Sequence, residues 1–158
     1  MSWRNPDRPF LVILDGSKVS DKIAVIKAMI EKADVFLIGG VMAYTFYKAL
    51  GIPTGTSRVE ADRVHLAKEL LALAKEKGVK FLLPVDDFET EELKTGAQSR
   101  KTPLHSSGQG IADGWQGVDS AKRLLRSTRL KLARRRPFSG TDQLGFLKFR
   151  ISRPAPEN

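Results

Sequence analysis

The fold is decided near the amino terminus by residues 10–23, which read FLVILDGSKVSDKI. Residues 10–14 form a continuous apolar run, which is typical of a strand covered on both faces in a parallel sheet. A turn at Gly16 follows, and from residue 19 to residue 32 the apolar side chains recur at helical spacing. Because a second apolar run lies at residues 35–38, we expect a strand–helix–strand unit with parallel strands and a right-handed crossover.

Two further helices are expected after this unit. Residues 41–50 have a helical pattern that is closed by Gly51. The sequence SRVE at residues 57–60 has the form of a capping box, and it predicts the start of a long helix that runs through Lys77 and ends at Gly78.

The apolar residues 79–83 predict a third strand, which is stopped by Pro84. Residues 86–107 are polar and rich in turn formers, so we expect a loop with a possible hairpin there. The fold class is therefore α/β: an incomplete three-layer, Rossmann-like domain built on a parallel sheet.

The turn after the first strand has the layout of a phosphate site. Lys18 and Lys22 are four residues apart, so they are expected on one face of the first helical turn, beside backbone N–H groups that have no partner within the helix. Such a place favours anionic oxygens. The alternative is a pair of solvated lysines on a surface helix, and the lysines alone do not decide between the two.

Three motifs resemble the phosphoglycerate kinase family. They are LDGSKVSDKI at residues 14–23, LIGGVMAYTF at 37–46 and GWQGVD at 114–119. The family has G-G-x-K-V-x-D-K-I, L-I-G-G-x-M-A-x-T-F and G-W-x-G-x-D in the same order, within its carboxyl-terminal, nucleotide-binding half. The resemblance covers residues 5–119, which we treat as a partial nucleotide-binding domain, 1–119.

The resemblance implies a set of site residues. Lys22 would hold the nucleotide phosphates, and Lys18, as the catalytic residue, would lie near the transferring phosphoryl group. The adenosine pocket and the turn beside it would be formed by Gly39, Gly40, Gly117 and Gly16. From the glycines alone, tight turns between strand and helix are an equal alternative.

One position departs from the family pattern, because Asp15 stands where the family has the first glycine of G-G-x-K. A carboxylate beside the phosphate path would repel an anionic ligand. It could pair with Lys18 instead.

The resemblance also implies an activity: a phosphotransferase with a carboxyl acceptor, which moves a phosphoryl group between ATP and 3-phosphoglycerate with Mg²⁺ in glycolysis. The nucleotide, ATP or ADP, is the expected partner of this chain, and 3-phosphoglycerate would be one only together with an amino-terminal domain. The family's magnesium-nucleotide loop is absent from these residues, so we expect no metal ligands here. Positioning of two substrates carries most of the catalysis in phosphoryl transfer, so we expect the isolated chain to be inactive.

The charge is divided unevenly along the 158 residues. Residues 1–119 contain 16 basic and 16 acidic side chains, whereas residues 120–158 contain 11 basic and 2 acidic ones, so the net charge of +9 lies in the tail. The alternative function is thus a basic-tailed module that binds nucleic acid or another polyanion without specificity. The chain has no cysteine and no apolar run of membrane-spanning length, so we expect a cytoplasmic protein with no membrane contact.

The tail, residues 120–158, is expected to be irregular or partly helical, and its sequence indicates a change of reading frame. After G-W-x-G-x-D the family continues I-G-P-K-T and later W-N-G-P-x-G-V-F-E, neither of which is visible here. If the frame is moved back by one base, the codons of residues 140–143 permit W-N-G-P and those of residues 145–148 permit G-V-F-E. We infer that the tail is the family's own coding sequence read out of frame from about Ser120.

Other residues that often carry chemistry have ordinary explanations here. His65 and His105, the two histidines, lack partners at metal-ligand spacing and are expected to be exposed and structural. Trp115 is expected to pack in the core or a turn. The acidic residues between 86 and 92 are expected to form a solvated loop and not a metal site.

Overall fold

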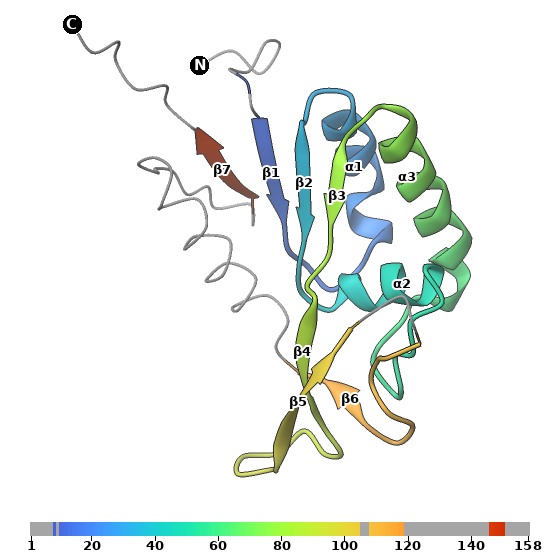
Figure 1. The fold of residues 1–158 in the computed structure, drawn as a ribbon, viewed down its shortest axis with the longest axis vertical. Helices are drawn as coiled ribbons and strands as arrows, with labels where there is room; N and C mark the ends of the chain where they lie inside the picture. The colour runs from blue at the N-terminus through green and yellow to red at the C-terminus, as the bar shows by residue number, and fades with distance from the viewer. Residues whose placement is uncertain (1–7, 9, 105–107, 119–145, 151–158) are drawn as a thin grey trace, which may run out of the picture.

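The computed structural model describes residue 8, residues 10–104 and 108–118, and the backbone of residues 146–150. Its larger sheet has the strand order β3-β2-β1-β7, in which β1, β2 and β3 are parallel (Figure 1). The strands are β1 (Phe10–Leu14), β2 (Val35–Ile38), β3 (Lys80–Leu82) and β7 (Phe146–Arg150). The predicted parallel strand–helix–strand unit is confirmed, with Leu14 in register with Ile38.

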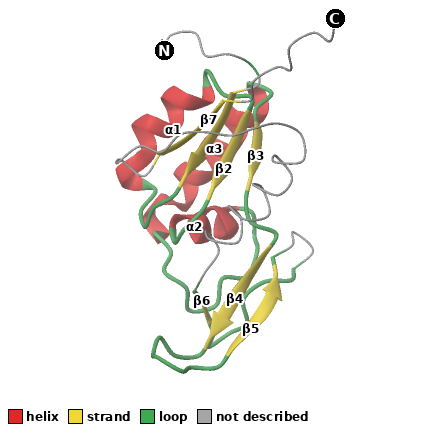
Figure 2. Ribbon diagram, turned by 90° about the vertical axis from the view of Figure 1, so that its left-hand side faces the viewer, coloured by secondary structure: helices red, strands yellow, loops and turns green. Residues whose placement is uncertain are grey.

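The three helices of the described residues lie on one face of this sheet (Figures 1 and 2). They are α1 (Ile23–Ile30), which follows the short 3-10 turn η1 (Ser20–Lys22), α2 (Met42–Ala49), and α3 (Val64–Glu76), which follows η2 (Ala61–Arg63). None of them is long and apolar enough to cross a membrane. The end of α2 at Gly51 and the end of α3 at Gly78 are confirmed, and both glycines have a positive φ, as expected after a helix.

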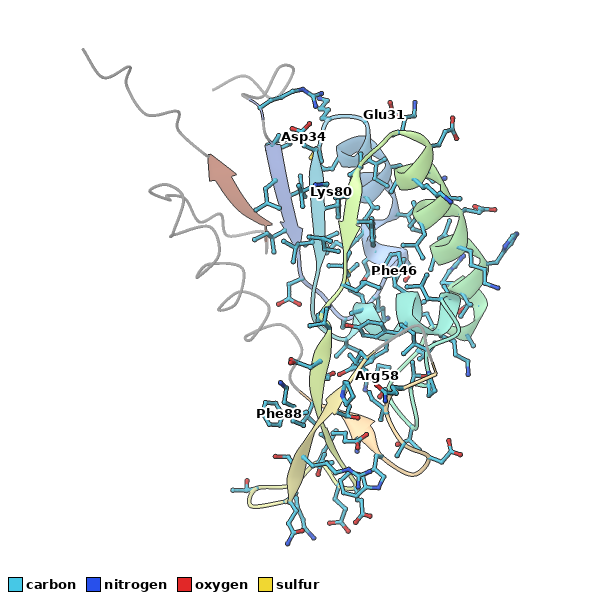
Figure 3. All side chains as sticks on the ribbon, in the orientation of Figure 1. Glu31, Asp34, Phe46, Arg58, Lys80 and Phe88 are labelled. Atoms are coloured by element: carbon cyan, nitrogen blue, oxygen red, sulfur yellow. The ribbon has the colours of Figure 1, made fainter. Side chains whose placement is uncertain are left out.

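The core lies between the sheet and the helices. Phe46 of α2 lies in this layer (Figure 3), with its ring centroid 5.2 Å from that of Phe81 on β3. Phe81 also stacks on Phe36 of β2 at 5.4 Å, so one aromatic cluster joins α2 to two strands.

A second sheet, with the order β5-β4-β6, lies beyond the carboxyl ends of β1–β3 (Figure 1). It consists of β4 (Asp86–Thr90), β5 (Ser99–Pro103) and β6 (Gln116–Gly117). The possible hairpin is confirmed, because β4 and β5 are antiparallel. The prediction of a solvated acidic loop is wrong for Asp87 and Glu89, which are only 1% and 2% exposed, whereas Glu91 and Glu92 are exposed as expected.

The buried carboxylates of β4 are tolerated because each has hydrogen-bond donors. Glu89 accepts from Arg100 Nε at 2.6 Å and from the backbone N–H of Ala112 at 3.0 Å. The Arg100 guanidinium also lies 4.0 Å above the Trp115 ring, which packs against the core as predicted.

Most of the tail lies outside the described residues, and so do His105, the arginine-rich stretch 123–136 and the predicted change of frame. His65 is exposed, as predicted, with Nε2 3.5 Å from Glu69. Five tail residues form β7, a strand that the sequence did not predict, and β7 pairs antiparallel with β1. β1 is therefore paired on both sides, with β2 on one and β7 on the other.

Candidate functional site

Two turns meet where β1 and β2 end. The backbone N–H of Gly39 donates to the carbonyl of Leu14 at 2.9 Å, and the N–H of Met42, the first residue of α2, donates to the carbonyl of Gly16 at 3.0 Å. The carboxyl ends of parallel strands are where open α/β sheets bind their ligands. The structure therefore brings the first two sequence motifs to one place.

Gly40 permits the close approach of the two turns. Its φ is +68°, and a Cβ added to it would lie 2.0 Å from Asp15 Oδ1 and 2.7 Å from the carbonyl oxygen of Gly16. No side chain fits there. The expected pairing of Asp15 with Lys18 is not formed among the described residues, because the Asp15 carboxylate lies against Gly40.

The two lysines follow the carboxyl end of β1, but their arrangement differs from the expected one. Lys22 ends η1, and its Cε lies 3.7 Å from the position that a Cβ on Gly16 would take. Lys18 precedes η1 and is exposed. The prediction that both lysines share the first turn of a helix is wrong, because α1 begins only at Ile23.

The backbone N–H groups beside the lysines already have an anionic partner. The Glu60 carboxylate accepts from the N–H of Val19 at 2.5 Å, from the N–H of Ser20 at 3.2 Å and from the Ser20 hydroxyl at 2.6 Å. Burial opposes ionisation of Glu60, but the hydrogen bonds from Ser20 and Val19 lower its pKa below the ordinary value. The expectation that these N–H groups await an external anion is therefore wrong at Val19 and Ser20.

The predicted capping box at residues 57–60 is also wrong, because both of its polar side chains have distant partners. The Ser57 hydroxyl accepts from the backbone N–H of Gly117 at 2.9 Å, and Glu60 contacts the turn after β1. No side chain caps η2 or α3. Glu60 does accept backbone hydrogen bonds, as in a capping box, but the donors lie 40 and 41 residues away in the sequence.

Gly117 lies against α2. A Cβ on Gly117 would lie 2.0 Å from the hydroxyl oxygen of Tyr44, which is one helical turn beyond Gly40. The Tyr44 hydroxyl donates to the buried carboxylate of Asp87 on β4. Gly117 is thus brought to the helix that follows the glycine turn of β2, with the Tyr44 ring where a side chain would be.

Five of the six predicted site residues therefore lie on the turns at the ends of β1 and β2, and Gly117 joins them through α2. Two other residues differ from their predicted roles. Asp15 lies against Gly40 and is not paired with Lys18, and Glu60 binds Val19 and Ser20 and does not cap a helix. The described residues contain no cluster of three or more His, Cys, Asp or Glu side chains that could hold a metal ion.

Comparison with known proteins agrees with the three motifs. The family model described as Phosphoglycerate kinase matches residues 1–138, past the boundary that we expected at Asp119. A phosphoglycerate kinase of Fervidobacterium nodosum is 43% identical over 129 residues, which are 82% of this chain and 32% of that protein. One from Clostridium perfringens is 52% identical over 114 residues, which are 72% of this chain and 28% of that protein.

Solved structures give the same result. The structure of phosphoglycerate kinase from Coxiella burnetii superposes with a TM-score of 0.72 at 28% identity, covering 82% of this chain and 32% of the other. That from Pyrococcus horikoshii superposes with a TM-score of 0.61 at the same identity, covering 81% and 32%. The chain spans about a third of the length of the proteins it matches. On its motifs, its parallel sheet and these matches, the chain belongs to the phosphoglycerate kinase family.

Proposed function

We propose that this chain is the nucleotide-binding part of a phosphoglycerate kinase and that it binds ADP or ATP at the ends of β1 and β2. The observation that carries the proposal is the juxtaposition of the lysine-bearing turn with the glycine turn of β2, joined by the hydrogen bond from Met42 to Gly16. Both turns lie at the carboxyl ends of parallel strands, which is where a nucleotide is expected in an α/β sheet.

Each residue has a part in this proposal. Lys22 contacts the phosphates of the bound nucleotide, and Lys18, which is exposed, lies beside the phosphoryl group that is transferred. Gly40 lets the two turns meet closely, and Gly16 and Gly39 lie on these turns beside the proposed ligand. Gly117 and the helix α2 border the adenosine.

The isolated chain supplies only part of the chemistry. We propose that the whole protein transfers a phosphoryl group between ATP and 3-phosphoglycerate with magnesium in the cytoplasm. The described residues of this chain supply no ligand set for the metal, and the chain covers about a third of its relatives. Purified chain given ATP, Mg²⁺ and 3-phosphoglycerate is therefore expected to show no turnover above background.

The nucleotide site is tested by titrating ADP into the full chain by calorimetry. Lys22→Ala is expected to weaken binding about tenfold, since it removes a charge-assisted contact to the phosphates. Lys18→Ala is expected to weaken it by a factor of about two, because this lysine acts mainly on the transferring group. The control is Lys27→Ala, which removes the same charge from an exposed position in the last turn of α1.

The control is expected to bind ADP like the parent chain. Equal weakening by all three substitutions would mean that ADP responds only to net charge, which would contradict the proposed site. No detectable ADP binding by the parent chain would contradict it as well.

A further inference from the structure

The turn that carries Lys18 and Lys22 is hydrogen-bonded to a side chain from another part of the sequence, Glu60. Glu60 lies in the segment between α2 and α3, and its carboxylate accepts three hydrogen bonds from Val19 and Ser20. Hydrogen bonds to an ionised acceptor are among the stronger ones in proteins. The two residues that donate them lie between Lys18 and Lys22 in the sequence.

Glu60 is itself fixed to α2. Its backbone N–H donates to Thr45 Oγ1 at 3.1 Å, and Thr45 is 1% exposed. α2 begins directly after the glycine turn of β2, and its first N–H, that of Met42, reaches back to Gly16. One residue thus connects the lysine turn, on one side, with the helix that follows the glycine turn, on the other.

We propose that Glu60 is a positioning residue, which fixes the turn that carries Lys18 and Lys22 relative to α2 and thereby strengthens the binding of nucleotide phosphates. The effect on ADP rests on the function proposed above. Positioning lowers the ordering cost that two long, flexible lysine side chains and their turn would otherwise add on binding.

The sign of the effect separates positioning from simple electrostatics. Glu60 carries a negative charge on the side of the molecule where an anion is to bind, so removal of that charge alone would tighten ADP binding. If Glu60 acts by holding the turn, its removal weakens ADP binding instead. A residue that serves stability alone would change the unfolding midpoint and leave the affinity of the folded chain unchanged.

The experiment compares the full chain with Glu60→Gln, Ser20→Ala and the control Asp62→Asn. Asp62 is exposed, and its removal deletes the same charge two residues away. Two quantities are measured on each protein: the hydrogen-exchange rates of the Val19 and Ser20 amides, resolved by NMR, and the Kd for ADP. Ser20→Ala removes one hydrogen bond and keeps the Glu60 charge, so it decides the question if Glu60→Gln does not fold.

For Glu60→Gln we expect at least tenfold faster exchange at Val19 and Ser20 and about fivefold weaker ADP binding. For Ser20→Ala we expect about twofold weaker binding, and for Asp62→Asn binding that is unchanged or slightly tighter. Unchanged exchange at Val19 and Ser20, or unchanged or tighter ADP binding by Glu60→Gln, would overturn the proposal. If the parent chain binds no ADP, the proposed function fails, and the exchange rates alone still decide whether Glu60 holds the turn.

Discussion

Asp15 is the residue at which this chain departs most clearly from its family pattern. Its carboxylate lies against Gly40, where the two turns of the candidate site meet. The carboxylate therefore adds a negative charge beside the proposed path of the phosphates. At about 4 Å, a like charge in water costs about 1 kcal/mol, which corresponds to about fivefold in affinity.

Asp15→Gly is accordingly expected to tighten ADP binding about fivefold, measured by calorimetry at low salt. The matched control is Asp113→Gly, which removes the same charge from an exposed loop next to Trp115. The control is expected to leave the affinity for ADP unchanged. Weaker binding by Asp15→Gly would indicate that the carboxylate supports the turn more than it repels the ligand.

Gly40 provides a second test at the scale of a single residue. Alanine at Gly40 meets both a positive φ and two oxygen atoms within 2.7 Å, whereas alanine at Gly51 meets a positive φ of +76° and no atom within 4 Å. Gly51→Ala is expected to lower the free energy of unfolding by about 1 kcal/mol, as is usual for a left-handed position. Gly40→Ala is expected to lower it by at least about 2 kcal/mol more, because the neighbouring turn must move.

Urea unfolding followed by circular dichroism measures both values. Equal losses at Gly40 and Gly51 would mean that the contact between the two turns is not tight in solution.

At the scale of elements, Glu60 joins the turn before α1 to the segment before α3. The hydrogen bonds from Ser20 and Val19 outweigh burial and lower its pKa from the ordinary value of 4.5. A carboxyl whose pKa is lower in the folded state stabilises the fold above its unfolded pKa. This contribution is lost as the pH falls through the folded pKa.

The difference in unfolding free energy between the parent chain and Glu60→Gln should therefore be constant from pH 7 to about pH 5.5. Below about pH 4.5 it should shrink, and it should vanish once Glu60 is protonated in the folded chain. Urea unfolding at a series of pH values measures the difference, with Asp62→Asn as the control. A difference that grows as the pH falls would contradict the assignment of these hydrogen bonds.

The elements that could be predicted are those whose sequence pattern and partners are local. The apolar runs of β1 and β2 and the glycines that end α2 and α3 belong to this class. The burial of β4 could not be predicted, because two of its buried residues, Asp87 and Glu89, are carboxylates whose hydrogen-bond donors are distant in sequence. The prediction of a capping box is wrong for the same reason, since Ser57 and Glu60 accept hydrogen bonds from backbone N–H groups 60 and 41 residues away.

The candidate site was predictable in part. The motifs identified the residues on both turns, because glycines and lysines that directly follow an apolar strand pattern can be recognised from the sequence alone. The position of the Asp15 carboxylate against Gly40 was not predictable, since it depends on how closely the two turns approach. Neither was the occupation of the Val19 and Ser20 N–H groups by Glu60.

At the scale of the whole molecule, the family match continues to residue 138, whereas the visible motifs end at Asp119. We propose that the tail is family coding sequence read one base out of frame. DNA sequencing across the Asp119 codon and past the codon of Asn158 is expected to give W-N-G-P-x-G-V-F-E in the frame one base earlier, followed by the family's glycine-rich nucleotide loop. Stop codons in that frame within residues 124–158 would contradict the proposal.

The central claim is that a nucleotide binds where the turns after β1 and β2 meet. An NMR titration of the ¹⁵N-labelled full chain with ADP tests it most directly, because each backbone amide reports its own surroundings. We expect the largest shift changes on residues 16–22 and 39–42, with smaller ones at Gly117. Shift changes confined to the basic residues 122–136, or none at all, would contradict it.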